Sequence, residues 1–429
     1  MQSVILVIWL LLPLVVGDDL TKIGVGKLAD EDVITDAESQ WRLDAIRKLW
    51  IERKRMAHTP LIEYNPPGFP KTTIYLKNET ATPTRTLKHR FAWALLLWAI
   101  TEGRVTSNTS AVYDSTSGNT GSAEAYMCHL VGVPYIAVVA DNLEPEKVRQ
   151  IESFGGKIQK VPVARRNLEA RERAEKSHGF YMNQFGNAEK AEEYHESGNF
   201  LYESTNVFHE ILVQLKQLRG QTTVPDYFIH AAGTGGTISS VGRYIVRYGA
   251  PTRVVLSDSQ FSLFYDYVLK EKFTNQSGKG IWSGPGVAGI GYGYDINPVL
   301  YGETTSLVRN VIHEAVKMPD IATVAATRIL NEKGFNFGPS TALNFLVSLF
   351  KAYQHQNSAN PANLTISTLA NDPGDYYQST YLNNTWVEQK FENFGGLKGM
   401  ECWKNIIANS IDTGSDFYTK GLTLCPGKY

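Results

Sequence analysis

Short apolar runs and longer amphipathic stretches alternate along most of the chain. From Ile74 onward, each apolar run is bounded by turn residues and has the length of a buried strand, whereas the stretches between them carry apolar residues at helical spacing. The pattern predicts strands at residues 74–77, 112–113, 135–139, 158–161, 227–230 and 254–256, and helices at residues 91–100, 145–154, 206–218 and 237–248. Strand and helix in turn predict an α/β protein with largely parallel sheets.

The chain begins with a different pattern. Residues 4–16 are continuously apolar, which is shorter than the roughly 20 residues that span a bilayer, and the acidic pair Asp18-Asp19 follows. The run fits the core of a secretory signal, with Val15 and Gly17 placed before a cut that leaves Asp18 as the first residue. We therefore expect a signal peptide at residues 1–17. Because no Lys or Arg precedes the run, an uncleaved anchor is the alternative.

Composition and charge narrow the choice of function. The 429 residues carry 42 Lys and Arg against 43 Asp and Glu, a formal net charge of −1, so nothing favours nucleic acid as a partner. With 43% hydrophobic residues, the chain has ample material for a folded core divided over two or three domains. No HExxH or CxxC pattern occurs, so no metal site is expected.

The cysteines and the sequons bear on secretion. Cys402 and Cys425 lie close together near the C-terminus, and if they pair they would close a short loop and remove roughly 3 kcal/mol of denatured-state entropy. Cys128 would then be a buried free thiol. Among the Asn-X-Ser/Thr sequons, we expect glycosylation at Asn108, Asn275, Asn363 and Asn383.

A glycine-rich segment follows the predicted strand at residues 227–230. Gly233-Thr234-Gly235-Gly236-Thr237 leads directly into a predicted helix, and strand, glycine turn and helix N-terminus together form a phosphate cradle. Glycines let backbone N–H groups approach an anion, and the helix dipole adds about half a positive charge there. Taken alone, the segment could also be a plain tight turn.

Two other segments carry candidate chemistry. In Ser115-Thr116-Ser117-Gly118-Asn119-Thr120-Gly121, small polar side chains at a helix start can hold a carboxylate or serve as an N-cap. Lys88 lies at the edge of an apolar helix, where burial suits Schiff-base chemistry, although a helix-start lysine is common. The glycines of segment 284–289 match dinucleotide spacing, but no strand precedes them and we do not expect a Rossmann site.

Read in order, these segments resemble the cysteine synthase and cystathionine β-synthase family, which are pyridoxal-phosphate enzymes of fold type II in the tryptophan synthase β-like superfamily. The resemblance covers nearly the whole body of the chain, and it is that of a divergent member of the family. The motifs stand in the family's order: Thr59-Pro60-Leu61, residues 74–90, Ser117-Gly118-Asn119-Thr120-Gly121, Gln184-Phe185, Gly233 to Thr237, Gly289-Ile290-Gly291, Gly338-Pro339-Ser340 and Asp372-Pro373-Gly374-Asp375-Tyr376-Tyr377.

The resemblance implies a role for each segment. Lys88 would form the internal aldimine with the cofactor and later shuttle the Cα proton. Asn119 would hydrogen-bond the ring hydroxyl, and Ser340 would face the pyridine nitrogen. The phosphate would lie on Gly233, Thr234, Gly235, Gly236 and Thr237, and the substrate carboxylate on Thr116, Ser117, Thr120 and Gln184.

It also implies an architecture. We expect two three-layer α/β/α lobes with mainly parallel sheets and the cofactor in the cleft between them. The signal peptide would be followed by an N-terminal segment at 18–77 packing partly on the larger lobe, a smaller substrate-binding lobe at 78–190, a larger cofactor-binding lobe at 191–382 and a C-terminal extension at 383–429. Asn78 would lie at a strand end near the cofactor loop, and we expect it to be unmodified.

Several residues depart from the family pattern near the expected site. Arg85 stands where glycine is usual, and it would narrow the mouth or bind an acidic substrate. His89 follows the lysine where aspartate is common, and Glu124 occupies a usually apolar place. Thr341 and Ala342 replace a serine–glycine pair. These departures bear on the identity of the substrate and on activity itself.

The function implied is β-replacement or β-elimination on serine, cysteine or an activated serine through an aminoacrylate, with a thiol or sulfide as second reactant, in a homodimer. A neutral hydroxyl opposite the ring nitrogen tempers the electron sink and suits such chemistry. A serine or threonine dehydratase is a close alternative. The departures motivate another, a secreted protein that binds the cofactor or an amino acid without turnover. We expect secretion or residence in the secretory lumen, with no membrane contact after cleavage.

Overall fold

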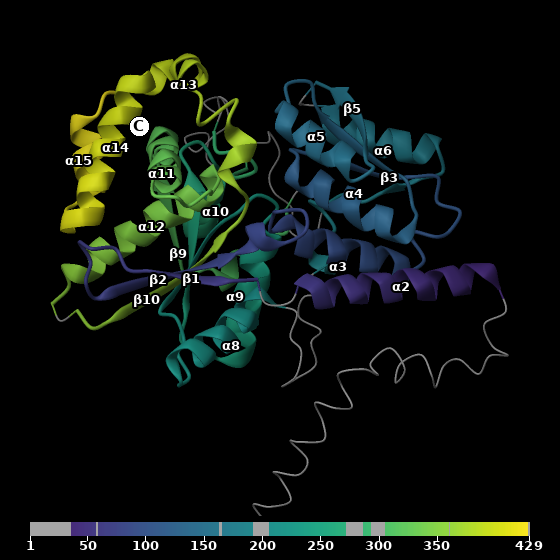
Figure 1. Ribbon diagram of the computed structural model, residues 1–429, viewed down its shortest axis with the longest axis horizontal. Coiled ribbons are helices and arrows are strands. Elements are labelled where there is room, and N and C mark those ends of the chain that lie inside the picture. Colours follow the sequence, from purple (N-terminus) through teal and green to yellow (C-terminus); the bar gives the residue numbers. More distant parts are fainter. Residues whose placement is uncertain are drawn as a thin grey trace, which may run out of the picture.

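The computed structural model describes residues 36–56, 59–162, 165–191, 206–271, 286–292, 305–359 and 361–427. These residues form two lobes, each built on a sheet of its own (Figure 1). The expected signal peptide, the sequon at Asn275 and most of the segment that joins the two lobes after residue 191 lie outside the described residues.

The larger lobe contains a six-stranded sheet in the order β1-β2-β10-β7-β8-β9. β1 pairs antiparallel with β2, and every other pairing is parallel. β10 therefore lies between the first strands of the body and β7, far from both in sequence. The strands are β1 (Leu61–Tyr64), β2 (Thr72–Asn78), β7 (Tyr227–Ala231), β8 (Arg253–Ser259), β9 (Glu314–Met318) and β10 (Leu364–Ala370).

Successive side chains of these buried strands point to opposite faces of the sheet, so both faces are apolar and helices cover each of them. Ile229 and Val255 pack toward one layer of helices, whereas Phe228 and Val254 pack toward the other. The first layer is α11 (Asp320–Glu332), α12 (Pro339–Gln356) and α14 (Gly396–Thr413), and the second is α8 (Val207–Arg219), α9 (Gly236–Tyr248) and α10 (Phe264–Lys270).

The smaller lobe contains a parallel four-stranded sheet in the order β5-β4-β3-β6. α3 lies between α2 and α4, and its residues 89–100 are all buried, which explains its continuous apolar pattern. α6 covers the opposite face. The elements are β3 (Val112–Thr116), β4 (Tyr135–Ala140), β5 (Lys157–Val161), β6 (Phe180–Tyr181), α2 (Ala37–Met56), α3 (Lys88–Thr101), α4 (Asn119–Val131), α5 (Pro145–Ser153) and α6 (Arg166–Lys176). The predicted fold class, two α/β/α lobes with mainly parallel sheets, is confirmed.

The N-terminal segment divides between the lobes. α2 packs along α3 in the smaller lobe, whereas β1 and β2 belong to the larger sheet (Figure 1). Among the described residues, no helix has the length and apolar character to cross a membrane. The described residues also contain short 3-10 helices: η1 (Glu79–Ala81), η5 (Arg309–Val311), η6 (Gly374–Tyr377) and η7 (Glu392–Phe394).

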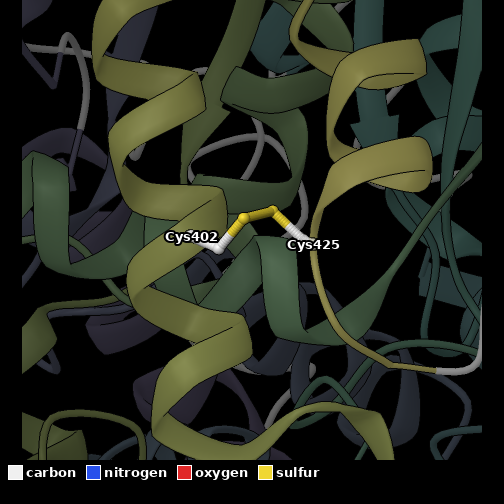
Figure 2. The surroundings of a disulfide bond; sticks show 2 residues. All are labelled: Cys402 and Cys425. Carbon is white, nitrogen blue, oxygen red and sulfur yellow. A yellow bond between two sulfur atoms is a disulfide. The ribbon is translucent and has the colours of Figure 1, made fainter.

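The C-terminal extension forms α13 (Asn384–Lys390), α14 and α15 (Phe417–Leu424), of which α14 packs against α11 (Figure 1). Trp403 and Ile407 of α14 are fully buried in the core of the larger lobe, so the extension is part of that core. A disulfide joins Cys402 of α14 to Cys425, just after α15, with their Cα atoms 5.5 Å apart (Figure 2). Cys128 is a buried free thiol.

Candidate active site

A cavity of about 510 Å³ opens between the lobes, and residues of both line it. Four helices begin at this cavity: α3 at Lys88, α4 at Asn119, α9 at Gly236 and α12 one residue before Ser340. Helix N-termini carry partial positive charge and unpaired N–H groups, so the site favours anions. None of the described residues that line the cavity is an aspartate or a glutamate.

The glycine loop between β7 and α9 forms one wall of the cavity. Gly235 has a φ of +90°, and a Cβ atom there would come within 2.3 Å of the backbone N of Leu307. A Cβ atom at Gly233 would meet the carbonyl oxygen of Gly289 at 2.3 Å. Only glycine fits at these two positions, and the backbone they leave bare at a helix N-terminus suits a phosphate.

Lys88, the first residue of α3, also lines the cavity. Burial lowers the pKa of Lys88 from 10.5 to about 8, and the negative charge of Asp372 limits the decrease. Its Nζ lies 5.5 Å from the ring centroid of Phe91. At neutral pH a usable fraction of the amine is therefore unprotonated, as a nucleophile or proton acceptor requires.

Ser340 lies at the N-terminus of α12 and lines the same cavity. Nδ2 of Asn371 donates to the Ser340 hydroxyl at 3.1 Å. This hydroxyl accepts from Asn371 and so keeps its own hydrogen for a second partner in the cavity. A neutral donor, not a carboxylate, therefore occupies this part of the site.

The asparagine loop contributes Ser117, Asn119 and Thr120 to the cavity. The Thr120 hydroxyl donates to Oε1 of Gln184 at 2.7 Å, and Nε2 of Gln184 donates to the Ser115 carbonyl at 2.7 Å. These bonds fix Gln184 beside the loop, where the Ser117 hydroxyl, the second Nε2 hydrogen of Gln184 and backbone N–H groups at the start of α4 can hold a carboxylate.

Thr116 is placed differently from the prediction. Its Oγ1 accepts hydrogen bonds from the backbone N–H groups of Gly118 and Gly121, both at 3.0 Å, and the residue is buried. It does not line the cavity. The Thr116 hydroxyl therefore shapes the loop, and its expected contact with the substrate stays a prediction.

Comparison with known proteins decides the family. A profile of pyridoxal-phosphate dependent enzymes matches residues 53–366. The chain belongs to this family. Members depend on pyridoxal phosphate, and the predicted cofactor and family are thereby confirmed.

Three similar proteins place the chain within the pyridoxal-phosphate dependent enzymes. A Caenorhabditis elegans protein, named as a candidate pyridoxal-phosphate dependent protein, is 72% identical over 96% of this chain and 96% of its own length. An L-cysteine desulfhydrase of Mycobacterium tuberculosis is 32% identical over 81% of this chain and 89% of its own. The crystal structure of O-ureido-L-serine synthase superposes with a TM-score of 0.62 at 25% identity, covering 77% of this chain and 94% of that one.

The residues present fit pyridoxal phosphate. The glycine loop at the start of α9 would hold the phosphate, and Lys88 presents an amine with a lowered pKa. Oδ1 of Asn119 is buried without a hydrogen-bond partner among the described residues, and this polar atom lies at the cavity wall, where a cofactor can reach it. The described residues thus supply a covalent anchor, an anion cradle and polar groups for the ring.

Sequence reasoning missed His230, Arg166 and Asn371, all of which line the cavity. Burial, with a smaller effect from the charge of Lys88, lowers the pKa of His230 to about 3, so its ring is neutral. Its Nδ1 lies 3.2 Å from Nδ2 of Asn344. A histidine inside an otherwise apolar strand, just before the glycine loop, was the available signal.

Arg85 does not line the cavity, so the expectation that it narrows the mouth or binds substrate is not supported. Its Nη2 donates to both carboxylate oxygens of Asp375, at 3.1 and 2.9 Å, and its guanidinium lies 5.3 Å from the ring centroid of Tyr376. Its φ is +57°, the left-handed conformation in which glycine is unstrained. This backbone conformation explains why the family usually has glycine at the position, where this chain has Arg85.

His89 and Glu124 are buried in hydrogen-bonded networks behind the site. The His89 ring lies 2.9 Å from Oε1 of Glu52 and 3.1 Å from Oγ1 of Thr84. Glu124 accepts from the Tyr135 hydroxyl at 2.7 Å. Neither residue lines the cavity, so these two departures from the family pattern change the packing behind the site and not the cavity wall itself.

Proposed function

We propose that the protein catalyses β-elimination or β-replacement on a β-substituted L-amino acid, with cysteine as the substrate that releases sulfide. The observation that carries this proposal is that Lys88, with its lowered pKa, and the neutral hydroxyl of Ser340 line the same cavity. The name of the M. tuberculosis relative, an L-cysteine desulfhydrase, supports cysteine. Pyridoxal phosphate, when bound, supplies an electron sink that stabilises negative charge at the Cα atom.

The chain's own residues would divide the work. Nζ of Lys88, with a pKa of about 8, would accept the Cα proton at neutral pH. Ser117, Thr120 and Gln184 would hold the α-carboxylate at the N-terminus of α4. Cysteine and water would then give sulfide, pyruvate and ammonia, which balances all atoms.

The test measures sulfide, pyruvate and ammonia from cysteine with purified protein loaded with pyridoxal phosphate. We expect equal amounts of the three products, no turnover by Lys88→Ala, and unchanged turnover by Lys48→Ala, which replaces an exposed lysine of α2. Pyruvate from serine without any reaction of cysteine would replace the proposal with a dehydratase. A bound cofactor whose absorbance no amino acid alters would replace it with a binding protein.

A secretory location is part of the same proposal. Asn108, Asn363 and Asn383 are exposed, as glycosylation requires, and the disulfide of the C-terminal extension needs an oxidising compartment. Oδ1 of Asn78 accepts from the backbone and hydroxyl of Thr80, at 3.1 and 2.7 Å, at the end of β2. Glycopeptide mapping should find sugar at the exposed sites and none at Asn78, and sequencing of the mature chain should begin at Asp18. A chain beginning at Met1 would contradict signal cleavage.

A further inference from the structure

Asp372 is a fully buried carboxylate that follows β10 and that the predicted site does not include. Its Oδ2 accepts two hydrogen bonds, from Nδ2 of Asn119 at 2.7 Å and from the hydroxyl of Tyr377 at 2.5 Å. Asn119 belongs to the smaller lobe and Tyr377 to the larger one. One carboxylate oxygen therefore joins the asparagine loop of the smaller lobe to the larger lobe.

The surroundings of Asp372 are shaped to admit it. A Cβ atom at Gly338 would come within 2.3 Å of Oδ1 of Asp372 and 2.7 Å of Cε2 of Tyr377. The backbone N–H of Gly338 also donates to the carbonyl oxygen of Asp372 at 2.9 Å. Because Gly338 lies two residues before Ser340, the same contacts hold the N-terminus of α12 against Asp372.

Charged groups of the smaller lobe act on Asp372. Lys147 of α5 has its Nζ 4.6 Å from the ring centroid of Tyr377, and its charge favours the ionised carboxylate, whereas the charge of Glu144 opposes it. Burial is the larger effect and raises the pKa of Asp372. In turn, the charge of Asp372 favours the ammonium form of Lys88. Asp372 thus acts on both side chains that the family assigns to the ring, Asn119 through a hydrogen bond and Lys88 through its charge.

The terminal torsion of an asparagine side chain has broad, shallow preferences, so Asn119 needs a partner to fix its amide. Nδ2 carries two hydrogens, and the one donated to Asp372 leaves the second for the oxygen of the cofactor ring. We propose that Asp372 is a positioning residue of the cofactor site, which orients the amide of Asn119 toward the ring.

The first test is a cycle of cofactor affinities, measured by fluorescence titration of the apoprotein with pyridoxal phosphate. It compares the wild type with Asn119→Ala, Asp372→Ala and the double variant. We expect Asp372→Ala to weaken binding roughly tenfold, in line with loss of a hydrogen bond to a charged group. The double variant should bind as Asn119→Ala alone, because Asp372 acts through Asn119. Effects that multiply, or no effect of Asp372→Ala, would overturn the proposal.

The second test measures how the charge of Asp372 affects the titration of the Lys88 amine. The rate at which the apoprotein gains visible absorbance on adding pyridoxal phosphate is measured against pH, which reports titration of the Lys88 amine. Asp372→Asn keeps the shape and an acceptor for Asn119, and it should move the midpoint about one pH unit lower. Asp375→Asn is the matched control in the same loop, exposed and paired with Arg85, and should leave the midpoint unchanged. An unmoved midpoint in Asp372→Asn would place Asp372 away from the cofactor-binding lysine and would overturn the proposal.

Both measurements use the cofactor without any amino acid. They rest on the cofactor-binding part of the proposed function and not on the substrate, so failure to turn over cysteine would leave their outcome intact. If Asp372→Ala does not fold, Asp372→Asn with and without Asn119→Ala completes the cycle. There the expected loss in affinity for Asp372→Asn alone is smaller than for Asn119→Ala alone, since the amide keeps an acceptor.

Discussion

Arg90 and Glu210 form a two-point ion pair that joins the helix of Lys88 to the larger lobe. Nη1 of Arg90 donates to Oε1 of Glu210 at 2.6 Å, and Nη2 donates to Oε2 at 2.8 Å. Arg90 lies two residues after Lys88 on α3, and Glu210 lies on α8. Since Arg90 also binds Glu79 through Nε at 2.6 Å, the start of α3 is fixed against the larger lobe by buried charge.

Glu210→Gln should lower the free energy of unfolding by about 3–5 kcal/mol, because it leaves buried cations short of a carboxylate. Lys77 and Arg53 also bind Glu210, at 3.0 and 2.9 Å, so three cations are affected. Burial opposes ionisation of Glu210, but these charges outweigh burial and hold its pKa well below the usual range. Its stabilisation is therefore complete at neutral pH and is lost as the pH falls below about 4.5.

The measurement is denaturant unfolding of the apoprotein at pH 7. Glu63→Gln is the control, since Glu63 is an exposed carboxylate 3.5 Å from Arg219, and such pairs contribute about 1 kcal/mol or less. Equal losses in the two variants would contradict a special role for the buried cluster.

The sequence revealed those parts of the site that are local in the chain. The glycine loop, Lys88, Asn119 and Ser340 each stand at a helix start within a short motif, and the structure brings all of them to one cavity. The alternation of short apolar runs with longer amphipathic stretches predicted parallel sheets, because buried parallel strands are short and apolar whereas their crossover helices are longer and amphipathic.

What the sequence did not reveal depends on contacts between distant segments. β6 has only two residues, too few for any pattern, and the place of β10 between β2 and β7 depends on pairing with strands that are distant in the sequence. The bond from Asn119 to Asp372 joins residues of different lobes. The hydrogen bonds by which Thr116 shapes its own loop were not predicted either, because a hydroxyl that accepts from its own loop and one that faces a ligand look alike in sequence.

Lys88→Met should make the apoprotein more stable at neutral pH, by about 1–3 kcal/mol. The folded protein holds the pKa of Lys88 at about 8, below its ordinary value of 10.5, so the unfolded chain binds the proton more tightly. The penalty is fully present below pH 8 and disappears as the pH rises toward 10.5. Unfolding of wild type and Lys88→Met should therefore converge at high pH. A constant difference across this range would show that the change in packing, not the charge, is responsible.

Arg85→Gly should be more stable than Arg85→Ala by about 1 kcal/mol. Both substitutions remove the contacts with Asp375 and Tyr376, but only glycine relieves the φ of +57°. The comparison of the two variants isolates the backbone, since the lost side-chain contacts are the same. Thermal unfolding of the apoprotein measures the order, and an alanine variant at least as stable as the glycine variant would show that the position is unstrained.

Glu124→Gln should gain stability relative to the wild type as the pH rises. Burial, and to a lesser degree the charge of Asp114, raises the pKa of Glu124 well above its ordinary value of 4.5, so the folded protein holds this proton to a higher pH than the unfolded chain does. The unfolded chain releases the proton above about pH 4.5, and the wild type loses about 1.4 kcal/mol per pH unit that glutamine does not lose.

The two proteins should unfold with free energies within about 1 kcal/mol of each other near pH 4.5, because the glutamine amide can still accept from Tyr135. At pH 7 the variant should be the more stable of the two, after allowing for the linked titration of Asp114, whose pKa is raised to about 7 mainly by burial. Glu124→Ala should fall below the wild type at pH 4.5, since it leaves the Tyr135 hydroxyl unpaired beside a cavity. A glutamine variant that is less stable at pH 7 than at pH 4.5, relative to the wild type, would mean that Glu124 is ionised in the folded protein and that its charge supports the wall behind the asparagine loop.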